Sequence, residues 1–170
     1  MPRSAVPLPD PFAVSPFAVA EAREAGVSAA RLRTGRLAAP FVGVRTAQMP
    51  ATVRDLVVSY LPKMAPAEFF SHRTAALMHD MWLPFVEAER LRLDVAVRPP
   101  ARAPRDARVD GHHLIDRPGL VEVRDGIPVA NPIETWCQLA TIISLQSCGV
   151  SRTEKVGTAT AATARSRGLD

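Results

Sequence analysis

The segment LVEVRDGIPVA, residues 120–130, constrains the fold more than any other stretch of the chain. Asp125 and Gly126 can adopt the positive φ angles of a tight two-residue turn, and apolar residues flank this pair on both sides. The segment therefore predicts a β-hairpin. Residues 91–97 alternate between apolar and more polar side chains, which predicts another strand that is buried on one face only; its apolar members are Leu91, Leu93, Val95 and Val97.

A helix is predicted directly after the hairpin, in the segment NPIETWCQLATII. Asn131 is placed to cap it, Pro132 suits the first helical position, and Glu134 can reach back to the cap. We expect its buried face to consist of Trp136, Leu139, Ala140 and Ile143.

Two more helices are predicted upstream. Residues 53–61 place apolar side chains on one helical face, and FFSHRTAALMHDMWLP, residues 69–84, follows with Ser71 as its cap. A basic, proline-rich loop over residues 98–108 leads to a strand within VDGHHL. Residues 52–145 thus predict an α+β domain with a short mixed or antiparallel sheet.

The N-terminal region predicts a smaller helical unit. Five prolines within the first sixteen residues indicate an irregular, flexible arm over residues 1–15. A helical pattern then runs to Gly26, where glycine can take the positive φ that ends a helix, and Ser28 is placed to cap the next helix. With PFVGVR, residues 40–45, as a wing strand, residues 16–46 predict a winged helix-turn-helix.

Positive charge is concentrated in this unit. The chain has 21 basic and 17 acidic residues, yet five arginines and no acidic residue fall between Ala25 and Arg54. In a recognition helix that begins at Ser28, Arg31 is placed to reach a guanine edge, and the other groups are placed to hold phosphates. The predicted DNA-binding residues are Ser28, Arg31, Arg33, Arg36 and Arg45. A solvated basic helix face is the alternative.

Several functional classes are disfavoured by the composition. No apolar run approaches the roughly 20 residues that span a membrane, and the N-terminus has too many prolines for a signal peptide, so we expect a cytoplasmic protein. The two cysteines are expected to be free thiols. The chain has no glycine-rich phosphate loop, and Asp94 and Asp110, its closest approach to a carboxylate pair, lack a companion motif. We therefore expect no enzyme and no cofactor.

The histidines predict neither catalysis nor metal binding. Ser71 and His72 are adjacent in a predicted helix, where neighbours do not face each other, so a nucleophile and base pair is not expected. His112 and His113 follow each other on a predicted strand and point to opposite faces. His79 can join one of them only through tertiary structure.

Three stretches together resemble the AbiEi-like antitoxins of type IV toxin–antitoxin systems, in the form common in high-GC bacteria. They are PFAVAEAREAGVSAARLRTGRL with PFVGVR, FFSHRTAALMHDMWLP with LRLDVAV, and VDGHHL with DGIPVANPIETWCQLA, and they cover about residues 16–143. The resemblance implies an N-terminal winged helix that binds double-stranded DNA. It also implies a second domain that supports autoregulation and opposes a nucleotidyltransferase toxin, and thus a transcriptional regulator or antitoxin-like protein.

The chain departs from the family pattern in several places. Ala18 stands where similar sequences usually have a capping threonine, Asp80 where glycine is usual, and His113 where a basic residue is usual. Residues 146–170 have no sustained apolar period and predict a disordered or aberrant tail, such as a frameshift or truncation produces. Many similar proteins continue into a Vsr-like endonuclease domain. The alternative functions are therefore a truncated remnant of such a protein without its catalytic domain, or an interaction protein that no longer binds DNA.

Overall fold

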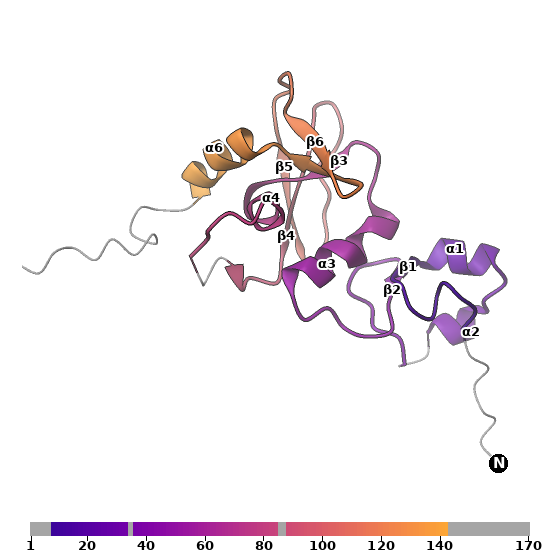
Figure 1. Cartoon of the computed structure of the whole chain (residues 1–170). Coiled ribbons are helices and arrows are strands. Elements are labelled where there is room, and N and C mark those ends of the chain that lie inside the picture. The colour runs from indigo at the N-terminus through magenta and orange to yellow at the C-terminus, as the bar shows by residue number, and fades with distance from the viewer. Residues whose placement is uncertain (1–7, 34–35, 85–87, 143–170) are drawn as a thin grey trace, which may run out of the picture.

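The chain forms a mixed α+β structure with two sheets (Figure 1). The structure is a computed structural model and describes residues 8–33, 36–84 and 88–142. A small N-terminal unit with a two-stranded sheet lies beside a larger unit with a five-stranded sheet. The predicted α+β class is thereby confirmed. The predicted tail at 146–170 and the first seven residues of the predicted arm lie outside the described residues.

The N-terminal unit contains two short helices, α1 (Val19–Glu24) and α2 (Ala29–Leu32), as the sequence predicts. Gly26 has a φ of +85° between them, and the Ser28 hydroxyl caps α2 by accepting from the Arg31 amide at 3.4 Å. Strand β1 (Phe17–Ala18) pairs antiparallel with β2 (Val44–Arg45). A small apolar cluster closes the unit, formed by Phe12, Phe17, Ala22, Val27 and Leu32.

The details of this unit differ from the sequence prediction. Helix α2 has one turn and ends at Leu32, whereas the expected recognition helix extends to Arg36. The expected wing strand is reduced to β2, and its partner β1 precedes α1. Ala18 caps α1 without a side-chain hydrogen bond, as its missing hydroxyl predicts. These features define a helical unit with a small sheet and do not by themselves establish a winged helix-turn-helix.

The larger unit is built on a mixed sheet with the strand order β5-β4-β3-β7-β6. Strands β4 and β5, and likewise β3 and β7, run parallel, whereas the β3–β4 and β6–β7 pairs are antiparallel. The predicted hairpin is confirmed as β6–β7, with φ of +52° at Asp125 and +78° at Gly126. The strands are β3 (Glu68–Phe70), β4 (Leu93–Val97), β5 (Val109–His113), β6 (Val121–Arg124) and β7 (Ile127–Ala130).

Strand β4 is buried on both faces, which corrects the predicted half-buried strand. Its polar and small members are as inaccessible as its apolar ones, since Asp94 is 2% and Ala96 0% exposed. The reason is tertiary, because β4 lies inside the sheet between β5 and β3 and helix α4 packs against it. Leu91, expected in this strand, precedes it and is 39% exposed.

Helices α3 (Val53–Tyr60) and α4 (His72–Met78) contact each other as predicted, and the 3-10 turn η1 (Leu61–Lys63) extends α3. Thr52 and Asp55 form a capping box at the start of α3. Of the five residues expected on the apolar face of residues 53–61, Val53, Leu56, Val57 and Tyr60 are buried, whereas Leu61 begins η1 and is 36% exposed.

Helix α6 (Pro132–Ile142) follows the hairpin, and the Asn131 carboxamide caps it by accepting from the Glu134 amide at 2.8 Å. Glu134 does not reach back, because the Asn131 amide donates to the Leu120 carbonyl. The predicted buried face is confirmed only at Leu139, which is 5% exposed, and is wrong at Trp136, which is 67% exposed, and at the exposed Ala140. Ile143 lies outside the described residues. The buried residues of α6 are Thr135, Gln138 and Leu139, because α6 packs on α4 through that side. Within the described ranges, no helix is long and apolar enough to cross a membrane.

Candidate functional site

The arginines of the N-terminal unit gather where α2 meets β2. The Arg45 side chain donates from Nε to the Leu32 carbonyl at 3.0 Å and from Nη1 to the Val44 carbonyl at 2.8 Å. It therefore closes the C-terminal end of α2 against β2. Arg33 follows α2 directly, and its exposed side chain donates from Nε to the Ala29 carbonyl at 3.3 Å.

The other predicted DNA-binding residues lie around the same helix. Ser28 and Arg36 are exposed, and Arg31 is half-buried. Arg54, the fifth arginine of the basic segment, lies elsewhere and forms an ion pair with Asp80 on α4's C-terminal side. The structure brings the arginines of α2 and β2 into one region. The DNA-binding roles of the five predicted residues stay predictions.

A groove of about 460 Å³ is lined by residues 39–43, which lead into β2, and by the loop before β5. Arg45 lines it on one side and Arg108 on the other. Asp106 also lines it, but Lys63 neutralises this carboxylate through an ion pair of 2.9 Å. The groove thus adds Arg108 to the basic residues that the N-terminal segment contributes.

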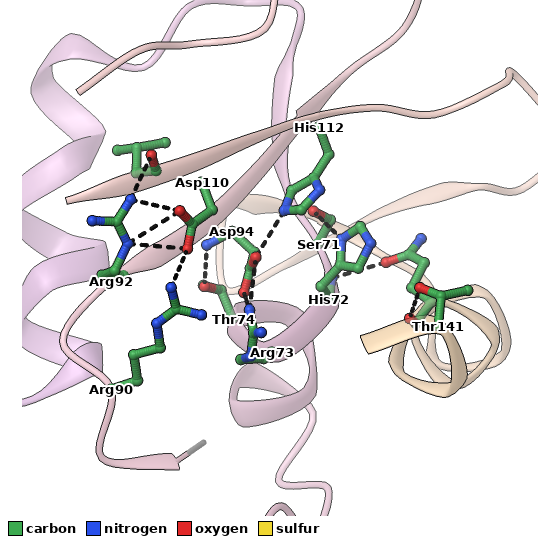
Figure 2. A network of polar contacts seen from close by, with 12 residues as sticks. Ser71, His72, Arg73, Thr74, Arg90, Arg92, Asp94, Asp110, His112 and Thr141 are labelled. Carbon is green, nitrogen blue, oxygen red and sulfur yellow. Dashed lines mark hydrogen bonds and ion pairs between the residues drawn. The ribbon is translucent and has the colours of Figure 1, made fainter. Parts of the chain in front are cut away.

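A buried polar cluster in the larger unit was not predicted. It joins Ser71 and His72 at the start of α4 with Asp94 of β4 and His112 of β5 (Figure 2). His112 Nε2 lies 2.7 Å from Asp94 Oδ1, and the His72 and His112 rings stack with centroids 3.9 Å apart. His72 Nδ1 lies 3.0 Å from Ser71 Oγ.

His72 occupies an unusual backbone position. It is the first residue of α4 and has a φ of +45°, which is uncommon for a residue other than glycine. The Gln138 side-chain carbonyl on α6 holds it by accepting from the His72 amide at 2.8 Å. Such strained positions persist where the surroundings fix them, and they often occur at functional sites.

Burial lowers the pKa of His72 to about 4, and the neighbouring His112 and Arg73 act in the same direction. The negative charge of Asp94 opposes this shift without cancelling it. His72 is therefore neutral near pH 7, and one of its ring nitrogens carries a lone pair.

Asp94 and Asp110, the two acidic residues noted in the sequence, are register partners on adjacent strands but bind different arginines. Asp94 pairs with Asp110 across the parallel strands β4 and β5. Arg73 Nη1 lies 3.2 Å from one oxygen of Asp94, whereas Arg90 and Arg92 bind Asp110 (Figure 2). The hydrogen bond and charge of Arg92 hold the pKa of Asp110 below its ordinary value, although burial opposes the shift. Both side chains therefore contact arginines.

The cluster corrects two expectations about individual residues. Ser71 does not cap α4 through its side chain, because its hydroxyl bonds instead to the adjacent His72 ring. The two side chains can meet because Ser71 is extended and His72 has positive φ, so neither has the geometry of a helix interior. Ser71 is nevertheless fully buried, which leaves its hydroxyl no contact with a substrate in this conformation.

Three members of the cluster, His72, Asp94 and His112, come from distant parts of the sequence. His112 and His113 do point to opposite sides of β5, and His113 contacts the Ala101 carbonyl in the neighbouring loop. His79 does not join the cluster, since its Nε2 lies 2.8 Å from the Ala130 carbonyl. Sequence reasoning missed the approach of His72 and Asp94 to His112. The only local signal was SHRT beside a strand that contains an aspartate.

Comparisons with known proteins return no matching family model, curated protein or solved structure.

Proposed function

We propose that the protein is a non-enzymatic DNA-binding regulator of the antitoxin-like type, which binds double-stranded DNA through a winged helix-turn-helix formed by the N-terminal unit. The observation that carries this proposal is the contact of Arg45 with the end of α2, which unites the arginines of α2 and β2 in one region. Helix α2 lies at the periphery of the molecule, on the side away from the five-stranded sheet (Figure 1). A duplex can approach it there without meeting the larger unit's sheet.

The chemistry of these side chains suits a phosphate backbone. Guanidinium groups bind phosphate oxygens in two-pronged geometry, and phosphate contacts supply most of the affinity in non-specific complexes. Arg33 and Arg36 are exposed beside α2, and no acidic residue lies between Ala25 and Arg54 to oppose a polyanion. Arg108 across the groove can extend the positive surface toward the larger unit.

The larger unit is proposed to bind a protein partner, a nucleotidyltransferase toxin according to the resemblance described above. Helix α6 offers a surface for such contact, since Ile133 and Trp136 are both exposed on it. Large exposed aromatic residues are frequent contact points in protein interfaces.

Fluorescence anisotropy tests the DNA proposal. The full chain is titrated into a labelled duplex from the region upstream of its own coding sequence and into a scrambled duplex, at two salt concentrations. We expect salt-dependent binding that is tighter for the upstream duplex. Arg33→Ala and Arg36→Ala should each lower the salt slope by about 1, because each removes one phosphate contact.

Arg117→Ala is the matched control, because it removes the same charge from an exposed arginine of the larger unit, where Arg117 pairs with Glu134. It should bind DNA like the unmodified chain. The proposal fails if the folded protein does not bind either duplex. It also fails if Arg117→Ala weakens binding as much as Arg33→Ala and Arg36→Ala do.

A further inference from the structure

We propose that His72, Asp94 and His112 form a binding site for a divalent transition-metal ion of the zinc class, separate from the proposed DNA contact. Each side chain offers one donor atom, and the three donor atoms lie within 4.8 Å of one another. They converge from the first residue of α4, the second residue of β4 and the fourth residue of β5 (Figure 2). Among the residues that the structure describes, these three side chains are the group whose donor atoms lie close enough together to hold one ion.

An ion can bind here without backbone movement if the three side chains turn toward it. In a tetrahedral zinc site with bonds of about 2.0–2.1 Å, donor atoms lie about 3.3 Å apart. His112 Nε2 and Asp94 Oδ1, now 2.7 Å apart, need to separate slightly, while the His72 donor moves inward. The stacked imidazoles must also rotate so that their lone pairs converge on the ion. These are side-chain rotations, and the metal replaces the hydrogen bond between His112 and Asp94.

The donor set selects the class of metal. Two imidazole nitrogens and one carboxylate oxygen are typical ligands of zinc and similar first-row ions, whereas calcium and magnesium prefer oxygen alone. Three protein ligands leave a fourth tetrahedral position for water. We therefore expect zinc or cobalt(II) to bind, and magnesium to have no effect.

The groups around the donors have the arrangement of outer-shell partners in metal sites. Ser71 Oγ contacts His72 Nδ1, so when Nδ1 donates its proton to the hydroxyl, Nε2 presents its lone pair. Arg73 Nη1 lies 3.3 Å from Oδ1 and 3.2 Å from Oδ2 of Asp94, so it orients the carboxylate as a whole. The positive charge of Arg73 also repels a metal ion bound to Asp94. We therefore expect weaker metal binding than in a structural zinc site with four protein ligands.

Burial gives an independent reason to expect a ligand here. Asp94 and His72 are 2% and 6% exposed, and His72 is held at its positive φ by Gln138. Gln138 Nε2 is buried and finds no acceptor among the described residues. A buried donor without an acceptor is costly, which marks this contact between α6 and the start of α4 as incompletely satisfied.

Calorimetric titration of zinc chloride into the EDTA-treated full chain tests the site. Cys137 is exposed and can bind zinc by itself, so the experiments use a Cys137→Ser background. We expect saturable binding of one ion per chain, a rise in melting temperature with zinc, and visible d–d bands of a tetrahedral centre with cobalt(II). His112→Gln should lower the zinc affinity at least tenfold and abolish the cobalt bands.

His113→Gln is the matched control, because it changes the neighbouring histidine that points away from the cluster toward Ala101. It should keep the affinity and the cobalt spectrum of the background chain. Asp94→Asn is a second ligand variant; if it does not fold, His112→Gln still decides the outcome. The proposal is overturned if the folded background chain shows no saturable binding, or if His112→Gln and His113→Gln bind zinc equally.

Discussion

Lys63 Nζ lies 2.9 Å from Asp106 Oδ2, and this ion pair joins the end of η1 to the loop before β5. The Asp106 carboxylate also accepts from the Val42 amide at 3.4 Å, so a single acidic side chain contacts both the N-terminal segment and the larger unit. Its side chain is only 5% exposed. Asp106 therefore helps to position the N-terminal unit, which carries the proposed DNA contact, against the five-stranded sheet.

Asp106→Asn should lower the free energy of unfolding by about 1.5–3 kcal/mol, the usual range for a hydrogen bond to a charged group. The loss arises because Lys63 is left without its partner in a place where its own side chain is 26% exposed. Urea unfolding of the full chain measures the change. Asp116→Asn is the control, since Asp116 forms a more exposed pair with Arg98 and should cost less than about 1 kcal/mol.

The same carboxylate predicts a dependence of stability on pH. Burial raises the pKa of Asp106, but the hydrogen bond and charge of Lys63 outweigh it and hold the pKa below its ordinary value of 3.8. The unfolded chain therefore binds this proton at higher pH than the folded chain does. The stabilisation is complete above the unfolded pKa and is lost as the pH falls through the folded pKa.

We accordingly expect Asp106→Asn to flatten the fall in unfolding free energy below about pH 5, where aspartates begin to protonate. Urea melts at a series of pH values compare the variant with the unmodified chain. Parallel curves for the two proteins would contradict the assignment of this acid sensitivity to Asp106.

Two glycines should respond differently to alanine. A Cβ on Gly111 in β5 would lie 2.3 Å from the Pro104 carbonyl oxygen, so the backbone of the loop must move. Gly126 has open space around its Cβ position, and alanine there meets only the strain of φ +78°. We expect Gly126→Ala to cost about 1 kcal/mol and Gly111→Ala to cost more. Thermal melting of both variants compares the two losses of stability. A larger loss in Gly126→Ala than in Gly111→Ala would contradict this prediction.

The orientation of α6 predicts that truncating its two large residues Leu139 and Trp136 will affect stability to very different extents. Leu139 is 5% exposed in the contact with α4, and Leu139→Ala should cost about 2–5 kcal/mol of unfolding free energy. Trp136 is 67% exposed, and Trp136→Ala should change stability by less than about 0.5 kcal/mol. Chemical denaturation followed by circular dichroism distinguishes them. A large loss from Trp136→Ala would mean that the helix packs through the face expected from the sequence.

Arg31→Ala and Arg45→Ala should affect DNA binding in different ways. We expect Arg31→Ala to remove one base preference from the upstream duplex, and Arg45→Ala to weaken all duplexes about equally and flatten the salt dependence. Because Arg45 also bonds to the carbonyls of Leu32 and Val44, its variant needs a melting curve to show that the unit remains folded. Unchanged binding by both folded variants would place the DNA contact elsewhere.

Local features of this fold were predictable because they depend on a few neighbouring residues. The turn at Asp125 and Gly126 needs only positive φ angles, and the caps at Ser28 and Asn131 need only a side-chain oxygen near free amides. The apolar face of α3 followed from helical spacing in the same way. Each of these predictions is confirmed in the described structure.

Features that depend on which elements become neighbours were predicted wrongly or not at all. Periodicity indicates that one side of a strand or helix is apolar, but only packing decides how many sides are covered. For this reason β4 is buried on both faces and α6 turns Trp136 to solvent. The length of α2 and the pairing of β1 with β2 also differ from the pattern expected for residues 16–46.

The sequence by itself determined the hairpin, the caps at Ser28 and Asn131, the α+β class and the concentration of arginines near the N-terminus, because all of these follow from local conformation or composition. Only the tertiary structure decided that His72, Asp94 and His112 meet, since they are separated by 22 and 18 positions along the chain. The parallel register of β4 with β5 places Asp94 near His112, and the packing of α4 on β4 adds His72. No local pattern encodes that meeting, because strand order and helix packing are properties of the whole domain.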